Sequence, residues 1–282
     1  MRNRFRLQFV AAFLTLFCVQ SLAATPRVVV SLPPIHSLVS ALMQGVGEPI
    51  LLFQQEIDST NEMDPFQKSQ LLTADLVIWV GAGLESSMTG MLQQFPAVKD
   101  RFTTLSHTVP LLPRKGFNGI QSSRQISRDL HFWSDPRIAM MAVKQLTPLL
   151  VRIDPDHAAR YLDNEILLLK RIKKTEREIL AMLAPLDPIP EQFAAEFDPY
   201  FSHRFVRTVS HSSESGIGLQ KVSTYPTATC RGVGKAQQRI DPGPEHYFQI
   251  MHAKARHIHT CAKQLRNITI TSENPDNRRQ ES

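Results

Sequence analysis

The sequence has few aromatic residues, little net charge outside its first segment and no apolar run of 18 residues. No membrane-spanning helix is therefore predicted. Aromatic residues make up 7% of the chain and are not interleaved with basic residues, so nucleic-acid binding has no support. The formal charge of +6 includes three arginines near the start, which leaves a mild +3 for the remainder. We expect a soluble protein, and the start of the chain predicts that it lies outside the cytoplasm.

The first 23 residues have the pattern of a secretory signal peptide. Arg2, Arg4 and Arg6 precede an apolar stretch over residues 9–19, and small residues follow at 21–23. This pattern predicts export to the periplasm. A lipid anchor on Cys18 is the alternative, but the bulky Phe17 stands where a lipobox needs a small residue.

Removal of residues 1–23 leaves two cysteines, Cys230 and Cys261. In an oxidising compartment two cysteines most simply form one disulfide. A metal–thiolate site is the alternative, because His257 stands four residues before Cys261 on a predicted helix.

The first half of the chain alternates between strand and helix patterns. β-branched or continuously apolar runs over 27–32, 49–53 and 74–80 predict strands, and helical spacing over 35–45, 65–73 and 84–95 predicts helices. An almost continuously apolar strand such as 74–80 is usually covered on both faces, as in a parallel sheet. We therefore predict an α/β lobe, with 102–128 as a long surface loop.

The second half is dominated by helix patterns. A helix over 138–151 leads into a very long helix over 154–183, in which Leu162, Ile166, Leu169 and Ile172 are expected on one apolar stripe. About thirty residues would span roughly 45 Å. Residues 206–239 are polar and show no buried strand, and a last helix follows 241–244.

These patterns predict five parts. They are a signal peptide (1–23), an N-terminal α/β lobe (24–153), a rigid linker helix (154–184), a shortened and incomplete C-terminal lobe (185–270) and a disordered tail (271–282). The predicted fold class is α/β, with two lobes built on parallel sheets.

Catalytic motifs are incomplete. Residues 232–235 (Gly-Val-Gly-Lys) suggest a phosphate loop, but Thr229 replaces the first glycine and Ala236 the magnesium-binding hydroxyl. The serine-rich run 210–215 has no nucleophile elbow. We expect that the protein is not an enzyme.

The run 129–133 (Asp-Leu-His-Phe-Trp) presents His131 just before a helix start. A neutral imidazole in such a loop is a good metal ligand, although a loop histidine can equally bond to the backbone at a helix start. This run, residues 28–42, the strand 74–81, Leu84-Glu85 and the segment 241–248 together resemble the zinc- and manganese-binding proteins of bacterial ABC importers, most closely their periplasmic zinc-uptake branch.

The resemblance implies two lobes that clasp one ion, zinc or less favourably manganese, through three histidines and often an acidic residue. His131 matches one histidine position, whereas the other two fall on Ser59 and Ala195. A serine is a poor zinc ligand and an alanine is none. The resemblance further implies a membrane permease as partner, a monomer, and a disulfide between Cys230 and Cys261.

Oxygen ligands could come from nearby carboxylates, namely Asp58, Glu62, Asp64 and Glu196. We expect His36 to be a packing or capping residue. We also expect the histidines of the last helix (246, 252, 257 and 259) to lie on a solvated face. Two functions remain: a zinc carrier that captures an ion and delivers it to a permease, or a divergent relative that no longer binds metal tightly and acts as an interaction protein.

Overall fold

The computed structural model describes residues 25–54, 62–113, 128–186, 188–190, 194, 197–209 and 243–273. The predicted signal peptide lies outside these residues. So do most of the polar stretch 206–239 and residues 274–282 of the predicted tail.

A four-stranded parallel sheet forms the centre of the first lobe. It consists of β1 (Val28–Val30), β2 (Ile50–Leu51), β3 (Leu76–Trp79) and β4 (Phe102–Thr104), in the order β2-β1-β3-β4. Val29 of β1 is opposite both Ile50 and Val77. All residues of β1 and β3 are buried, as expected for strands that are covered on both faces. The predicted parallel α/β lobe is confirmed.

The edge strand β4 was not predicted. It lies between two 3₁₀ helices, η2 (Pro96–Arg101) and η3 (Leu105–His107), in the segment where we expected a loop. The three residues of β4 are half-buried, and Trp79 donates a hydrogen bond from Nε1 to Oγ1 of Thr104 at 2.8 Å. The strand is short and contains two polar threonines, so its pattern resembles that of a loop.

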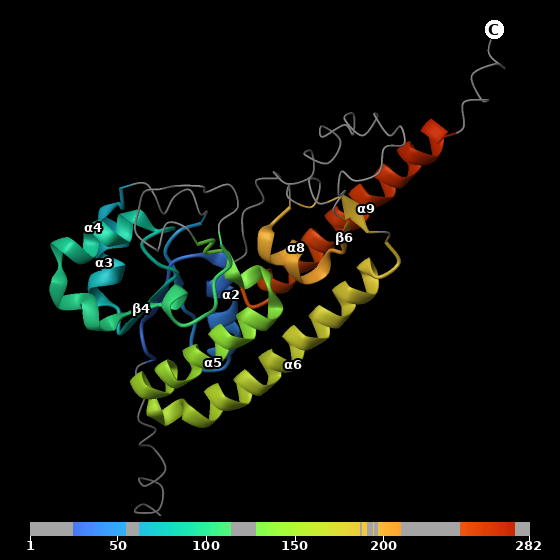
Figure 1. Ribbon diagram of the computed structural model, residues 1–282. Helices are drawn as coiled ribbons and strands as arrows, with labels where there is room; N and C mark the ends of the chain where they lie inside the picture. Colours follow the sequence, from blue (N-terminus) through green and yellow to red (C-terminus); the bar gives the residue numbers. More distant parts are fainter. Residues whose placement is uncertain are drawn as a thin grey trace, which may run out of the picture.

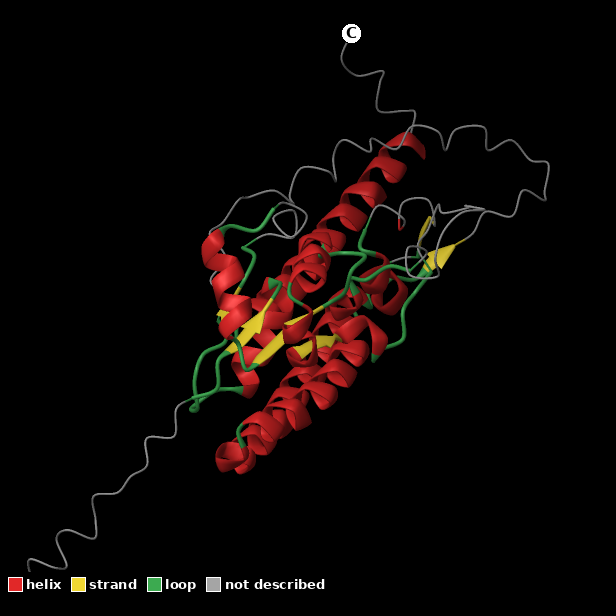
Figure 2. Cartoon of the chain, turned by 90° about the vertical axis from the view of Figure 1, so that its left-hand side faces the viewer, coloured by secondary structure: helices red, strands yellow, loops and turns green. Residues whose placement is uncertain are grey.

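Helices cover both faces of this sheet. The views in Figures 1 and 2 place α3 (Pro65–Thr73) and α4 (Ser86–Gln94) on one side, and α2 (Pro33–Leu42) with α5 (Pro136–Ile153) on the other. At the end of β3, the buried carboxylate of Glu85 accepts hydrogen bonds from the backbone N–H groups of Val80 and Gly81 at 2.9 and 2.7 Å. This end of the sheet is therefore pinned to the start of α4.

The long helix α6 (Ala158–Leu183) follows α5 through the 3₁₀ helix η5 (Pro155–His157) and packs against α5. Figure 1 shows α6 running from the first lobe to the second. The predicted apolar stripe was wrong: Leu162 and Ile166 are 52% and 66% exposed, whereas Ile172 is buried. The buried face of α6 carries Tyr161, Asn164, Leu168, Ile172, Thr175, Ile179 and Leu183.

The second lobe is small in the part of the chain that the structure describes. It contains the parallel strands β5 (Ile189–Pro190) and β6 (Thr208–Val209), with α8 (Pro199–Phe205) and α9 (His246–Glu273). The second lobe has a small apolar core, which consists of Ile189, Ala194, Cys261 and Ala262. The last helix continues three residues into the region predicted to be a disordered tail.

The start of α9 belongs to the core of the first lobe. Tyr247 is buried there, and its backbone N–H donates to Oγ of Ser37 in α2 at 2.9 Å. This contact joins the two lobes. Within the described ranges, no helix combines the length and apolarity that a bilayer crossing requires.

Candidate metal centre

A cleft of about 300 Å³ opens where the two lobes meet. The first lobe contributes the start of α2, Gln54, His131 and Trp133. The second lobe contributes Asp198, and α9, whose start packs against the first lobe, contributes His246 and Lys254. The carboxyl ends of parallel strands are a common place for ligand binding in α/β folds, and α2 begins directly after β1. The cleft therefore lies where this fold favours a ligand.

His131 stands immediately before the 3₁₀ helix η4 (Phe132–Ser134), as the sequence predicted. Oδ1 of Asp129 accepts from the backbone N–H of His131 at 2.9 Å and lies 2.8 Å from its ring Nδ1. The ring also meets that of Trp133 edge-on, with centroids 5.2 Å apart. With Nδ1 held by a carboxylate, Nε2 would be the nitrogen that ligates a metal.

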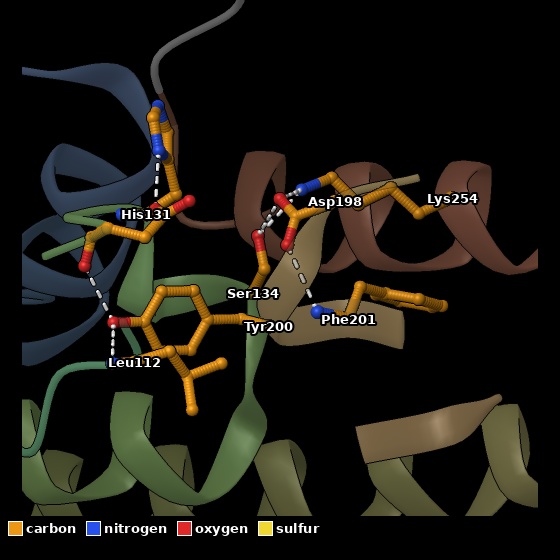
Figure 3. Close-up of polar contacts among 8 residues, drawn as sticks. Leu112, His131, Ser134, Asp198, Tyr200, Phe201 and Lys254 are labelled. Atoms are coloured by element: carbon orange, nitrogen blue, oxygen red, sulfur yellow. Dashed lines mark hydrogen bonds and ion pairs between the residues drawn. The ribbon is translucent and has the colours of Figure 1, made fainter. Parts of the chain in front are cut away.

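Tyr200 fixes the loop that carries Asp129 (Figure 3). Its hydroxyl donates to the backbone carbonyl of Asp129 at 2.7 Å and accepts from the N–H of Leu112 at 2.8 Å. Burial raises the pKa of Tyr200 to about 12, so the hydroxyl stays protonated as a donor. The second lobe thus positions the loop of the first lobe that carries Asp129 and His131.

Three polar side chains converge beside His131 in the same cleft. Oδ2 of Asp198 accepts from Oγ of Ser134 at 2.8 Å and from Nζ of Lys254 at 2.6 Å, while Oδ1 caps α8 by accepting from the N–H of Phe201 at 3.0 Å. Nζ of Lys254 also lies 2.6 Å from Oγ of Ser134. Figure 3 shows this group bridging the two lobes.

The other predicted ligand positions fall elsewhere. Ser59 and Ala195 lie outside the described residues, as do Asp58 and Glu196. Asp64 caps α3, where it accepts from the N–H of Gln67 at 2.7 Å, and Glu62 pairs with Lys68 at 3.4 Å. Neither lines the cleft. The described residues contain no cluster of three or more side chains able to hold a metal ion.

Histidines outside the predicted site gave a mixed outcome. His36 is 4% exposed, and its Nε2 lies 2.8 Å from the carbonyl oxygen of Pro49. This confirms a packing role. The prediction for α9 was wrong, since His246, His252, His257 and His259 are all half-buried rather than on a solvated face. His246 lines the cleft, which we did not anticipate.

The predicted disulfide stays a prediction. Cys230 lies outside the described residues, and Cys261 is 2% exposed in the small core of the second lobe. Sγ of Cys261 lies 4.0 Å from Nδ1 of His257. The proximity of these two side chains was expected from their spacing on one helix.

The chain is similar to proteins of known zinc-uptake systems. The family model described as "Zinc-uptake complex component A periplasmic" matches residues 28–205. The high-affinity zinc uptake system protein ZnuA of Brucella abortus (strain 2308) is 26% identical, with 79% of each chain covered. The protein of the same name from Paracoccus denitrificans (strain Pd 1222) is 24% identical, with coverage of 75% of this chain and 72% of the relative.

Solved structures share the fold. The periplasmic zinc-binding protein TroA from Treponema pallidum has a TM-score of 0.52 at 19% identity, covering 70% of this chain and 71% of its own. Zn(II)-bound AdcA from Streptococcus pneumoniae has a TM-score of 0.59 at 13% identity, covering 85% of this chain and 58% of its own.

The lobes, the helix that connects them and the cleft between them define a two-lobe solute-binding protein. The chain belongs to the periplasmic zinc-uptake complex component A family, because that family model matches well over half of its residues.

Proposed function

We propose that this protein is the periplasmic zinc-binding component of an ABC-type uptake system, which captures the ion between its two lobes and delivers it to a membrane permease. The observation that carries the proposal is His131, oriented by Asp129 and facing residues of the second lobe across one cleft. The names of the matched relatives support zinc as the cargo. They favour a transport function over the alternative of an interaction protein that has lost its metal.

The donor types in the cleft suit zinc. His131 and His246 offer imidazole nitrogen and Asp198 offers carboxylate oxygen, and these are two of the three donor classes that zinc prefers in proteins. The three side chains do not form a metal-binding cluster as they stand in the structure, so capture of an ion would require the cleft to rearrange. The carboxylate of Asp129 behind His131 would fix the ring and raise the basicity of the ligating nitrogen. No bond of a substrate would be made or broken, since the function is capture and release.

Export and assembly follow from the same proposal. Residues 1–23 would direct the chain to the periplasm and be removed there. The mature protein would act as a monomer that docks on the permease. With α6 packed against both α5 and α9, lobe movement would be limited, and release would depend on docking.

Zinc titration of the apo-protein tests this function. We expect submicromolar zinc binding, measured by competition with a chelator, that weakens at least a hundredfold in His131→Ala because the central imidazole donor is lost. His203→Ala is the matched control, because His203 is exposed on α8 and does not line the cleft. Absence of zinc binding in the unmodified protein, or equal binding by both variants, would overturn the proposal. Tighter binding of manganese than of zinc would mean that manganese is the transported ion.

A further inference from the structure

Lys254 places a positive charge inside the cleft that should receive a zinc ion. Its side chain is 29% exposed, and its ammonium pairs with Oδ2 of Asp198 at 2.6 Å. Asp198 is the one carboxylate among the described residues that line this cleft. Among the described residues, the carboxylate that the cleft offers to a metal ion is therefore already paired with a cation of the protein itself.

An ammonium and a zinc ion favour the same partner. Zinc ligands include carboxylate oxygens, and two cations brought to one carboxylate in a half-buried cleft repel each other more strongly than in water. A lysine ammonium sits on a flexible four-carbon stem. It can withdraw from Asp198 when a metal ion arrives and return when the ion leaves.

The helix cap does not depend on Lys254. Oδ1 of Asp198 accepts from the N–H of Phe201 at the start of α8, whereas Oδ2 accepts from Lys254 and Ser134. Oδ2 can therefore exchange the ammonium for a metal ion while Oδ1 still caps the helix.

We infer that Lys254 is a tethered competitor of the transported ion: its ammonium occupies Asp198 in the metal-free cleft and sets the zinc affinity below what the ligands alone would give. This inference rests on the proposed function, because it concerns the same cleft. Its consequence for transport is that the returning ammonium favours release of the ion.

Removal of the charge tests the inference. Lys254→Met should bind zinc about tenfold more tightly or better than the unmodified protein, measured by chelator competition. Lys254→Arg keeps the charge and should not tighten binding. Lys263→Met is the matched control, because Lys263 is exposed on the same helix. Lys254→Gln serves as a second neutral variant in case Lys254→Met does not fold, and circular dichroism checks the fold of each.

Asp198→Asn separates competition from simple repulsion. In Asp198→Asn no carboxylate is present for Lys254 to occupy. The increase in zinc affinity caused by Lys254→Met should therefore be less than half as large in the protein that carries Asp198→Asn as in the protein that keeps Asp198. An equal gain in both backgrounds would overturn competition for Asp198, and so would unchanged zinc affinity in both neutral variants.

The two proposals fail in different ways. If the unmodified protein binds zinc and the neutral variants bind it equally, only the competitor role fails. If the unmodified protein does not bind zinc but the neutral variants do, the competitor role stands and the proposed uptake function fails. If none of them binds zinc, both are overturned.

Discussion

At the residue scale, the orientation of His131 depends on Asp129, which contacts both its backbone N–H and its ring Nδ1. We expect Asp129→Ala to weaken zinc binding by about tenfold to a hundredfold, the usual effect of removing a carboxylate that orients a histidine ligand. The measurement is chelator competition on the apo-protein.

Asp129→Asn is the informative companion variant. Its amide oxygen can still accept both hydrogen bonds but carries no charge, so the loss should be smaller than in Asp129→Ala. Equal zinc affinity in Asp129→Ala and the unmodified protein, with an unchanged melting temperature, would show that His131 needs no orienting partner.

Individual residues were predictable where their role is local. His131 and its place before a helix start follow from a five-residue run, and His36 was correctly assigned to packing. Asp198 and Lys254 were missed, because they are 56 residues apart in the sequence and meet only in the folded cleft. Asp198 did carry one local signal, since an aspartate before Pro199 is typical of a helix start.

At the scale of elements, the side chain of Asn164 in α6 forms hydrogen bonds to the end of α2, beside the apolar packing between the two helices. Nδ2 of Asn164 donates to the carbonyl oxygens of Leu42 and Gln44, each at 2.8 Å, at the end of α2. Asn164→Ala would leave two carbonyl groups without this donor in a mostly buried site. We expect the free energy of unfolding to fall by about 2 kcal/mol, as measured by urea denaturation. Asp163→Ala, at an exposed neighbouring position, should change it by less than about 0.5 kcal/mol.

The role of Asn164 also helps to explain why the predicted apolar stripe of α6 was wrong. The apolar periodicity of Leu162 and Ile166 was assigned to the core, but both are exposed, and the buried face uses Tyr161, Asn164 and Thr175 instead. Polar residues that bond to other elements are not visible to an apolar pattern. The strands β1 and β3 were predicted correctly because they are uniformly apolar, whereas the edge strand β4 has too few apolar residues to be found.

At the scale of the whole molecule, the sequence predicted the parallel sheet of the first lobe and the long connecting helix, and the size of the second lobe stays a prediction. The sequence could not predict how the lobes meet, because that depends on ion pairs between distant segments. Glu176 of α6 shows this most clearly. It accepts hydrogen bonds from Arg204 of α8, whose Nε lies at 2.8 Å, and from Nε of Arg137 of α5 at 3.1 Å.

Glu176 should make the stability of the assembled lobes depend on pH. Burial alone would raise its pKa, but the hydrogen bonds from Arg204 and Arg137 outweigh burial, and the pKa lies below its ordinary value of 4.5. A carboxyl group whose pKa is lowered by folding stabilises the fold above its unfolded pKa, and this contribution is lost as the pH falls through the folded pKa. The contribution is therefore complete above about pH 5 and disappears at more acidic pH.

Glu176→Gln tests this dependence. At pH 7 the variant should be less stable by about 2 kcal/mol, because two arginines lose a charged acceptor. The difference should shrink steadily as the pH is lowered from 5 towards 3, since the glutamate of the unmodified protein becomes protonated there. Urea denaturation at each pH gives both curves. Glu165→Gln, at a half-buried position about three turns nearer the first lobe on α6, is the control. The difference in free energy of unfolding between Glu176→Gln and the unmodified protein could instead be the same at pH 7 and pH 3. That result would mean that the ionised form of Glu176 does not join the lobes.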